Sequence, residues 1–391
     1  MRISPIPVSL SRRAIFALLL AVILAPPVAQ AQLSFTPGQV WLDEGGMPVQ
    51  SHTGGLLFEN GVYYWYGMNF AGPEIPARTL PRLDYAWLLN MGVTVYSSRD
   101  LLAWKLESTQ LADVSYGPGG LLQPLNLVVR PKVVKNDATG KYIMMAGLIS
   151  PDFDVFNDVI YAEADRPEGP FRLMGKLGWC GKPNATGLWT GPWEPGTGQK
   201  DAQWGAAAGD APDRIRAFDT TLYKDDDGKA YLITAHSRIL AYELSADYTC
   251  ASRVEVMRGA EGEAPALFKD RGTYYLLASR LTGWFPNRNS YFTSSSIHGP
   301  WTAQGPFAKG PGEETTYGGQ TTFVLKVEGK PHAFIFMADR FGDASGHDFP
   351  DFKTATHIWL PIEIDAATHR MTVNWRRSWD LSVFPPGTGA K

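Results

Sequence analysis

Two carboxylates each stand directly in front of a short apolar segment of this 391-residue chain. Glu263 precedes the run APALF, and Asp219 precedes TTLY. A positioned carboxyl group can act as a general acid if it keeps its proton near neutral pH. Burial or a neighbouring negative charge raises the pKa of such a group and meets that condition. Glu263 is the candidate for the acid. A solvated glutamate at a strand start and an aspartate in a turn are the ordinary alternatives.

These carboxylates belong to a local pattern that recurs about five times. In each copy an apolar strand is followed by a Gly- or Asp-rich turn and an aromatic-rich strand, which indicates a β-hairpin. Repeated hairpins predict an all-β fold, a five-bladed β-propeller, whose central funnel receives side chains from every blade. Glu263 and Asp219 stand at equivalent blade entries, so we expect both to point into the funnel. The copies are GGLLFENGVYYWYG (54–67), RPKVVKNDATGKYIMMAG (130–147), FDTTLYKDDDGKAYLITA (218–235), EAPALFKDRGTYYLLAS (263–279) and TTFVLKVEGKPHAFIFMA (321–338).

Residues 1–31 are expected to be a signal peptide rather than part of the fold. Arg12 and Arg13 precede an apolar run at 14–25, and the AQA at 29–31 is a small-residue cleavage site, as in secretory signals. The run is too short for a transmembrane helix. We therefore expect residues 32–391 to form one exported domain, periplasmic or secreted and free of the membrane after cleavage. The paired arginines leave ordinary and twin-arginine export both open.

The composition of the chain limits the classes of partner and cofactor that we expect it to bind. The formal net charge is −3 and no basic stripe is present, which argues against nucleic acid. No Cys/His spacing predicts a zinc site, so no metal ligands are assigned. The DDDG run at 225–228 indicates a hairpin turn rather than a calcium loop. Cys180 and Cys250 are the only cysteines. In an oxidising compartment they either pair or stay as separate buried thiols.

Seven stretches, in order along the chain, resemble glycoside hydrolase family 43, whose members are five-bladed propeller glycosidases. Within that family they are similar to the branch that contains exo-β-1,3-galactanases. The resemblance implies an inverting, exo-acting glycosidase with an oligo- or polysaccharide substrate; we expect a monomer without a cofactor. A central calcium ion occurs in some family members, but this sequence does not establish one. The stretches are SHTGGLLFENGVYYWYG (51–67), VRPKVVKNDATGKYIM (129–144), DTTLYKDDDGKAYLI (219–233), GEAPALFKDRGTYYL (262–276), LTGWFPN (281–287), YGGQTTFVL (317–325) and HIWLPI (357–362).

The resemblance implies roles for the catalytic candidates. Glu263 matches the family's general acid, and Asp219 matches the aspartate that orients the acid and tunes its pKa. Most members use a first-blade aspartate as the base, but the SHTGG at 51–55 holds no carboxylate. The galactanase branch shares that absence and places a glutamine near the water, which Gln320 matches. Because an amide is a very poor base, we expect Gln320 to position water. His52 is chemically the better base, with a structural histidine as the alternative.

Further residues are candidates for substrate binding. Thr282 and Trp284 match a family motif near the sugar at subsite −1, where Trp284 either stacks on the ring or packs between blades. Arg130, Arg216 and Arg280 lie in or beside matched motifs. They either bind the carboxylate of an acidic sugar or pair with blade carboxylates.

Two departures from the galactanase branch bear on the substrate. Val129 and Met68 stand where the branch has glutamates. A sugar hydroxyl facing an apolar side chain loses a charge-assisted hydrogen bond, and its desolvation is uncompensated. A galactose-specific pocket is therefore not expected to be intact. The sequence favours a galactan 1,3-β-galactosidase-like enzyme. The alternatives are an α-L-arabinofuranosidase or β-xylosidase and an inactive carbohydrate-binding propeller.

Overall fold

The computed structural model describes residues 33–76, 87–112, 121–149, 158–181, 215, 217, 219–235, 238–342 and 351–386. The signal peptide predicted at 1–31 and the candidate Arg216 lie outside these residues. Within the described ranges, no helix has the length and apolar character needed to cross a membrane.

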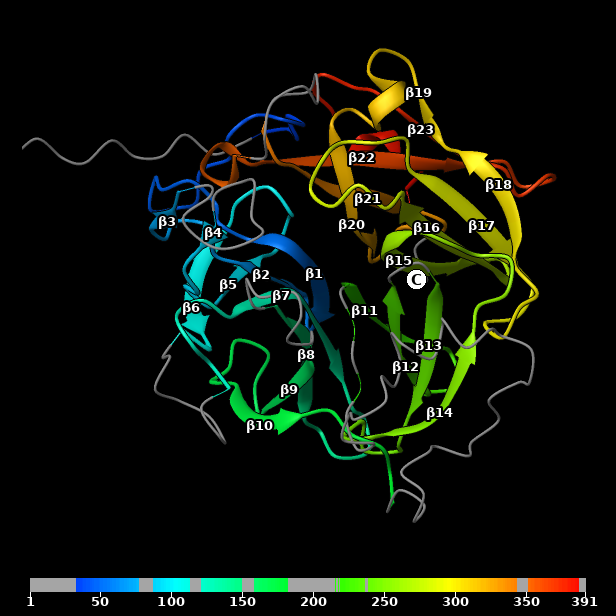
Figure 1. Ribbon diagram of the computed structural model, residues 1–391. Coiled ribbons are helices and arrows are strands. Elements are labelled where there is room, and N and C mark those ends of the chain that lie inside the picture. The colour runs from blue at the N-terminus through cyan, green and yellow to red at the C-terminus, as the bar shows by residue number, and fades with distance from the viewer. Residues whose placement is uncertain are drawn as a thin grey trace, which may run out of the picture.

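Five antiparallel sheets surround a common axis (Figure 1), which confirms the predicted five-bladed β-propeller. The first strand of each blade contacts the first strand of the next, and the last of these contacts the first, so the ring is closed. Blade 1 contains β1 (His52–Glu59), β2 (Val62–Met68), β5 (Val93–Ser98) and β6 (Lys105–Gln110). Blade 2 contains β7 (Leu127–Lys135), β8 (Tyr142–Ile149), β9 (Asp158–Ala164) and β10 (Arg172–Lys176). Blade 3 contains β11 (Asp219–Lys224), β12 (Ala230–Ala235), β13 (Ile239–Leu244) and β14 (Ala251–Val256).

The last two blades complete the ring. Blade 4 contains β15 (Glu263–Asp270), β16 (Thr273–Ser279), β17 (Ser290–Ser294) and β18 (Thr302–Pro306). Blade 5 contains β20 (Gly319–Lys326), β21 (Phe334–Arg340), β22 (Thr356–Ile364) and β23 (Met371–Asn374), with β19 (Ala308–Lys309) parallel to β23 at its edge. Outside the blades lie β3 (Glu74–Ile75), β4 (Trp87–Leu88) and the short 3₁₀ turns η2 (Glu313–Thr315), η3 (Phe352–Thr354) and η4 (Leu381–Val383).

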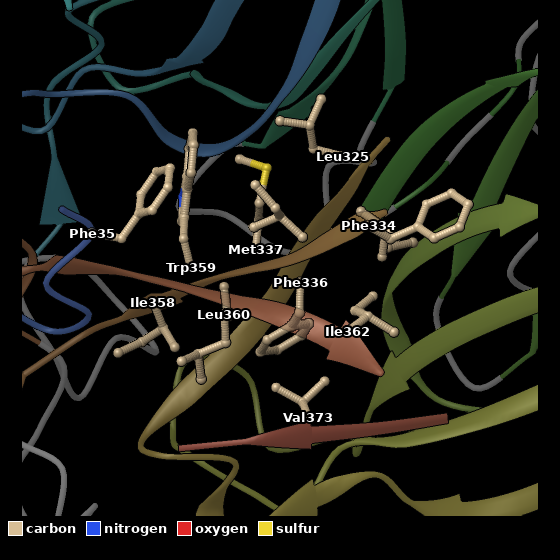
Figure 2. Close-up of a cluster of buried hydrophobic side chains, with 14 of the residues drawn as sticks. Phe35, Leu325, Phe334, Phe336, Met337, Ile358, Trp359, Leu360, Ile362 and Val373 are labelled. Carbon is tan, nitrogen blue, oxygen red and sulfur yellow. The ribbon is translucent and has the colours of Figure 1, made fainter. Parts of the chain in front are cut away.

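Apolar side chains fill the space between neighbouring blades, because each blade is covered on both faces. Figure 2 shows the cluster on blade 5, where Phe35 of the N-terminal segment lies beside Trp359 of β22. Phe35 and Trp379 also exchange backbone hydrogen bonds of 2.7 and 3.1 Å, and their rings stack at 4.2 Å. Burying one such side chain is worth roughly 1.5–3 kcal/mol, so this contact fastens the two ends of the described chain to blade 5.

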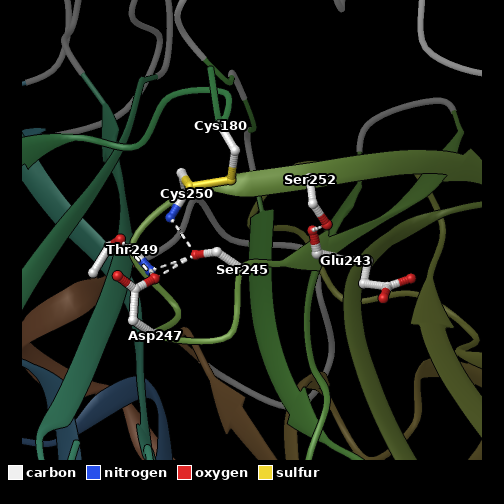
Figure 3. The surroundings of a disulfide bond; sticks show 7 residues. All are labelled: Cys180, Glu243, Ser245, Asp247, Thr249, Cys250 and Ser252. Carbon is white, nitrogen blue, oxygen red and sulfur yellow. Dashed lines mark hydrogen bonds between the residues drawn. A yellow bond between two sulfur atoms is a disulfide. The ribbon is translucent and has the colours of Figure 1, made fainter.

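A disulfide joins Cys180, which follows blade 2, to Cys250, which immediately precedes β14 of blade 3 (Figure 3). Of the two states that the sequence left open, the structure therefore contains the paired one. The hydroxyl oxygen of Ser245 accepts hydrogen bonds from the amides of Thr249 and Cys250, both 3.1 Å long, and donates to Asp247 Oδ1 at 2.6 Å. This turn presents Cys250 to its partner in the neighbouring blade.

Candidate active site

The site lies where the first strands begin, at one end of the axis. In β1, β7, β15 and β20 the strand pairing shifts register at that end. Thr53, Arg130 and Ala264 adopt left-handed backbone conformations there, with φ of 56°, 52° and 55°. Each such residue costs on the order of 1–3 kcal/mol unless its surroundings hold it. Bulges of this kind redirect neighbouring side chains. Here they lie beside Glu263, the predicted acid, and at Arg130, a candidate for substrate binding.

Side chains from the preceding blade hold these strand starts. Blades 1, 2, 4 and 5 each receive such a bond at the first strand, and between blades 2 and 3 the bond runs the other way, from a side chain of blade 3 to the backbone of blade 2, so the bonds form a ring around the axis. The Arg130 amide donates to Thr53 Oγ1 (3.1 Å), the Ala264 amide to Asp219 Oδ2 (2.7 Å), the Thr321 amide to Asn289 Oδ1 (3.0 Å) and the Thr53 amide to Asp339 Oδ2, while Thr220 Oγ1 donates to the Arg130 carbonyl (3.3 Å).

Glu263 has the electrostatic surroundings of a general acid. Its Oε1 accepts hydrogen bonds from the Thr282 amide at 3.2 Å and from Gln320 Nε2 at 3.3 Å. Burial and the charge of Asp219 raise the pKa of Glu263 to about 8, although the Arg130 guanidinium opposes them. The carboxyl is therefore mostly neutral at pH 7. Oε1 thus accepts two N–H donors, and the Gly283 amide also contributes a hydrogen bond to this carboxyl.

Protein groups engage the Arg130 side chain in the structure. Its side chain is only 2% exposed. Nε pairs with Asp219 Oδ1, Nη2 donates to Gln320 Oε1 at 2.6 Å, and Nη1 donates to the Thr321 carbonyl at 3.2 Å. Of the two sequence interpretations, pairing with a blade carboxylate is the one present in the structure. Arg130 thus holds Asp219 and Gln320 in fixed positions.

Gln320 links the arginine to the acid. Its Oε1 faces Arg130, and the two N–H groups of its Nε2 are shared among three acceptors within hydrogen-bond distance: Glu263 Oε1, Ser279 Oγ at 3.2 Å and the Gly283 carbonyl at 3.0 Å. A side chain held at both ends of its amide is suited to orienting a neighbouring molecule. It is not suited to taking up a proton.

His52 is buried away from these groups. It is 1% exposed and stacks between the rings of Phe70 and His357, at centroid distances of 4.4 and 4.5 Å. Burial lowers the pKa of His52, so its imidazole is neutral at pH 7. The His52 ring contacts Phe70, His357 and Asp339. Asp339 Oδ1 lies 3.5 Å from His52 Nδ1.

His52, Asp339 and His357 are also the group, in the described ranges, whose donor atoms could hold a metal ion, since these atoms lie within 4.8 Å of one another. His357 Nδ1 is 2.9 Å from Asp339 Oδ1, a hydrogen-bond distance. Burial opposes ionisation of Asp339, but the hydrogen bond with His357 and the nearby imidazole of His52 outweigh it and lower the pKa of this carboxyl. The ionised Asp339 then binds the Thr53 amide. Hydrogen bonding therefore accounts for Asp339 and His357, whereas neither ring nitrogen of the buried His52 has a hydrogen-bond partner among the described residues.

Sequence reasoning did not select Asp339 or His357. His357 begins the HIWLPI stretch, and Asp339 lies near the end of β21 in FMADR. A charged residue inside an otherwise apolar strand was the available signal for Asp339, because such residues are seldom buried without a partner.

Thr282 and Trp284 lie in the loop between β16 and β17, beside the acid. Thr282 Oγ1 donates to the Phe285 carbonyl at 2.7 Å and accepts from Asn287 Nδ2 at 2.7 Å, so the loop is internally braced. The same residue supplies the amide that binds Glu263. Thr282 thus connects the shape of this loop to the position of the acid.

Met68 and Val129 form part of a buried apolar cluster against which Trp284 packs. Trp284 meets Phe341 and Phe352 edge to face, at centroid distances of 4.9 and 5.4 Å. The Trp284 side chain remains half-buried. The two positions that depart from the galactanase branch therefore contribute apolar packing beside this tryptophan.

Known proteins resemble the chain in sequence and in fold. Residues 189–359 match Glycosyl hydrolases family 43. A family 43 β-1,3-galactosidase, solved with galactodeoxynojirimycin, has a TM-score of 0.72 and 29% identity, covering 89% of this chain and 100% of that one. Another family 43 β-1,3-galactosidase has a TM-score of 0.71 and 28% identity over 90% of this chain, which spans 64% of its length.

An exo-β-1,3-galactanase from Phanerochaete chrysosporium, solved with β-1,3-galactotriose, has a TM-score of 0.67 and 26% identity, covering 90% of this chain and 68% of that one. No curated protein sequence matches the chain. The family match over residues 189–359, the five-bladed fold and these structural relatives together make the chain similar to glycoside hydrolase family 43, a family of glycosidases.

Proposed function

We propose that the protein is an exported, exo-acting and inverting glycosidase. Its proposed substrate is β-1,3-galactan or a related plant or microbial polysaccharide side chain. The observation that supports this most strongly is Glu263, a carboxyl with a pKa of about 8 whose Oε1 is bound by Thr282 and Gln320. Binding a sugar requires no acid of this kind, whereas protonating a leaving oxygen does.

In the proposed reaction, Glu263, Asp219 and Gln320 each have a separate role in hydrolysis of the glycosidic bond. Glu263 gives its proton to the glycosidic oxygen as the bond to the anomeric carbon breaks, and Asp219 keeps the acid protonated until then. Water attacks the opposite face of an oxocarbenium-like transition state. Gln320, fixed by Arg130, orients that water, whose proton passes to solvent.

One observation favours a second candidate for the sugar at subsite −1. Met68 and Val129 place apolar side chains where hydroxyl-binding carboxylates are expected. A sugar with fewer hydroxyl groups on that side, such as a pentose, avoids an uncompensated desolvation. An α-L-arabinofuranosidase or β-xylosidase is therefore the second candidate function.

Hydrolysis by residues 32–391 of galactan, arabinan and xylan oligosaccharides and their aryl glycosides tests both candidates. Glu263→Gln is the diagnostic variant, and Glu314→Gln, at an exposed glutamate of the turn η2, is the matched control. We expect turnover of one sugar series that Glu263→Gln removes and Glu314→Gln retains. Failure to hydrolyse any series, with equal sugar binding by wild type and Glu263→Gln, would instead indicate a carbohydrate-binding propeller.

Three further parts of the proposal have direct readouts. Inversion predicts that proton NMR detects the product first as the anomer opposite to the substrate. Activity is proposed to need no cofactor, so it should survive a chelator of divalent ions. A monomer in the periplasm or medium is expected from cell fractionation and gel filtration of the exported protein.

A further inference from the structure

Lys132 of β7 is a lysine buried between the first strands of neighbouring blades. It is 2% exposed, and it makes no ion pair with any residue that the structure describes. A lysine is seldom buried without a partner, because the protein interior solvates its charge poorly. The steps proposed above for hydrolysis do not use this residue, so its burial has another reason.

The Lys132 amine binds two backbone carbonyl groups at the strand starts of blades 1 and 2. Nζ donates to the Thr53 carbonyl at 2.9 Å and to the Arg130 carbonyl at 3.4 Å. Burial and the charge of Arg130 lower the pKa of Lys132 well below its ordinary value. The charges of Asp219 and Asp339 act in the opposite direction. Because a neutral amine still has two N–H groups, both hydrogen bonds can form in either protonation state.

The two carbonyl groups belong to residues with left-handed backbones. Thr53 and Arg130 have φ of 56° and 52°, a conformation that residues other than glycine seldom adopt. The strand pairing of β1 and of β7 shifts register at the same places. Such a conformation persists only where the surroundings hold it. Lys132 joins the two carbonyl groups and therefore ties these residues to each other.

Blade 1 has a glycine where the stem of Lys132 passes. A Cβ at Gly55 would lie 2.5 Å from Lys132 Cδ and 3.1 Å from the ring of Phe323. The backbone of Gly55 is not in the left-handed region, so its conformation does not require glycine. The missing side chain at Gly55 instead leaves space for the lysine.

The backbone that Lys132 holds carries the side chain of Arg130. The Arg130 amide donates to Thr53 Oγ1 at 3.1 Å, which fixes the same two residues a second time. From there the guanidinium pairs with Asp219 and donates to Gln320 Oε1 at 2.6 Å. The direction in which Arg130 points therefore depends on the carbonyl groups that the lysine binds.

We propose that Lys132 is a positioning residue for the proposed hydrolysis. By binding two backbone carbonyl groups, it keeps the Arg130 guanidinium directed at Asp219 and Gln320. The inference rests on the proposed function, because that function takes Asp219 and Gln320 as the groups that assist the acid. In this role Lys132 acts only through Arg130 and makes no contact with the sugar.

Three variants separate this role from general packing. Lys132→Met keeps an unbranched apolar stem and removes the donor. Lys135→Met is the matched control, because Lys135 lies on the same strand and pairs with Glu59 at 2.6 Å. Gly55→Ala displaces the stem of Lys132 and retains its amine, so it replaces Lys132→Met if that variant fails to fold.

The first measurement needs no turnover. In NMR spectra of the isotope-labelled protein, the Arg130 Nε–H signal is identified by its absence from Arg130→Lys, and its exchange with water is followed. Lys132→Met should raise the exchange rate at least about tenfold, as the loss of one hydrogen bond to a charged group gives. Gly55→Ala should raise it as well, and Lys135→Met should leave it unchanged. Backbone amides of β22 report a general loss of stability and should change less.

Kinetics on the sugar series that wild type hydrolyses give the second measurement. A displacement of about 1 Å can cost about 100-fold in rate, so Lys132→Met should lower kcat by about this factor and change KM far less. An Arg130 signal that Lys132→Met and Gly55→Ala leave unaltered, or a loss confined to KM, would overturn the proposal. An inactive wild type would refute the proposed function, while the Arg130 signal would still decide whether Lys132 positions this arginine.

Discussion

Replacing Glu263 by glutamine is expected to change how folding stability depends on pH. The pKa of this carboxyl rises from an ordinary 4.5 to about 8 in the folded chain. Below pH 4.5 the folded and unfolded chains both carry it neutral. Between pH 4.5 and 8 the unfolded chain releases a proton that the folded chain retains, so the free energy of unfolding of wild type falls as the pH rises. Because glutamine does not titrate, the free energy of unfolding of the variant does not fall in this way as the pH rises.

The size of the effect follows from the two pKa values. At 1.36 kcal/mol per pH unit, their difference corresponds to about 3–5 kcal/mol at pH 8 and above, the lower figure allowing for the part of the carboxyl that water still reaches. Wild type and Glu263→Gln should therefore have similar stability near pH 4.5, because glutamine matches the neutral acid in shape. At pH 9 the variant should be the more stable of the two by this amount.

Urea unfolding of residues 32–391 at pH 4.5, 7 and 9 measures the difference directly, since the free energy extrapolated to water is compared at each pH. Glu314→Gln serves as the control, because this exposed glutamate of the turn η2 should leave the pH dependence of wild type unchanged. A difference between Glu263→Gln and wild type that stays constant from pH 4.5 to pH 9 would refute the raised pKa. The reasoning for Glu263 as the acid would then fail with it.

Three other changes have defined outcomes. Asp219→Asn removes the charge that helps raise the pKa of Glu263, so the alkaline limb of kcat/KM against pH should move to lower pH; an unmoved limb would contradict the coupling. Arg130→Met leaves the Asp219 carboxylate buried without its cation and should lower the free energy of unfolding by about 3–5 kcal/mol, whereas a loss below about 1 kcal/mol would show the pair to be dispensable. Reducing the Cys180–Cys250 disulfide, whose cysteines are 70 residues apart, should cost up to about 4 kcal/mol, seen as a lower Tm with reductant than without.

The blades could be predicted from the sequence because each hairpin is a local structure. The strand alternation and turn residues of FDTTLYKDDDGKAYLITA are legible within eighteen consecutive residues, and β11 and β12 form there with a continuous register. Glu263 could be predicted for the same reason, since its place at a strand start follows from the residues beside it.

The partners of the site residues could not be predicted in this way. The Thr53 amide binds Asp339, 286 positions away, and Arg130 binds Gln320, 190 positions away. Such contacts depend on the closure of the ring, and no local pattern specifies them. The sequence therefore left Arg130 open between sugar and protein, and it missed Asp339.

The glycines of SHTGG show the same limit. A Cβ at Gly54 would lie 1.7 Å from the Tyr66 carbonyl oxygen, and one at Gly55 would lie 2.5 Å from Lys132 Cδ. Gly55 thus makes room for Lys132, whose Nζ donates to the Thr53 carbonyl at 2.9 Å. The motif marks a crossing point between blades, and the sequence contained it without revealing which side chain it accommodates.

The hydrogen bonds that pass from each blade to the next have a consequence for how this protein gains its activity. Asp219 comes from blade 3, Glu263 from blade 4 and Gln320 from blade 5, while the arginine that fixes two of them comes from blade 2. No blade, and no adjacent pair of blades, contains the working set. The proposed catalytic set is therefore a property of the assembled circle, because parting any two neighbours among blades 2 to 5 would separate its members even while the individual sheets persist.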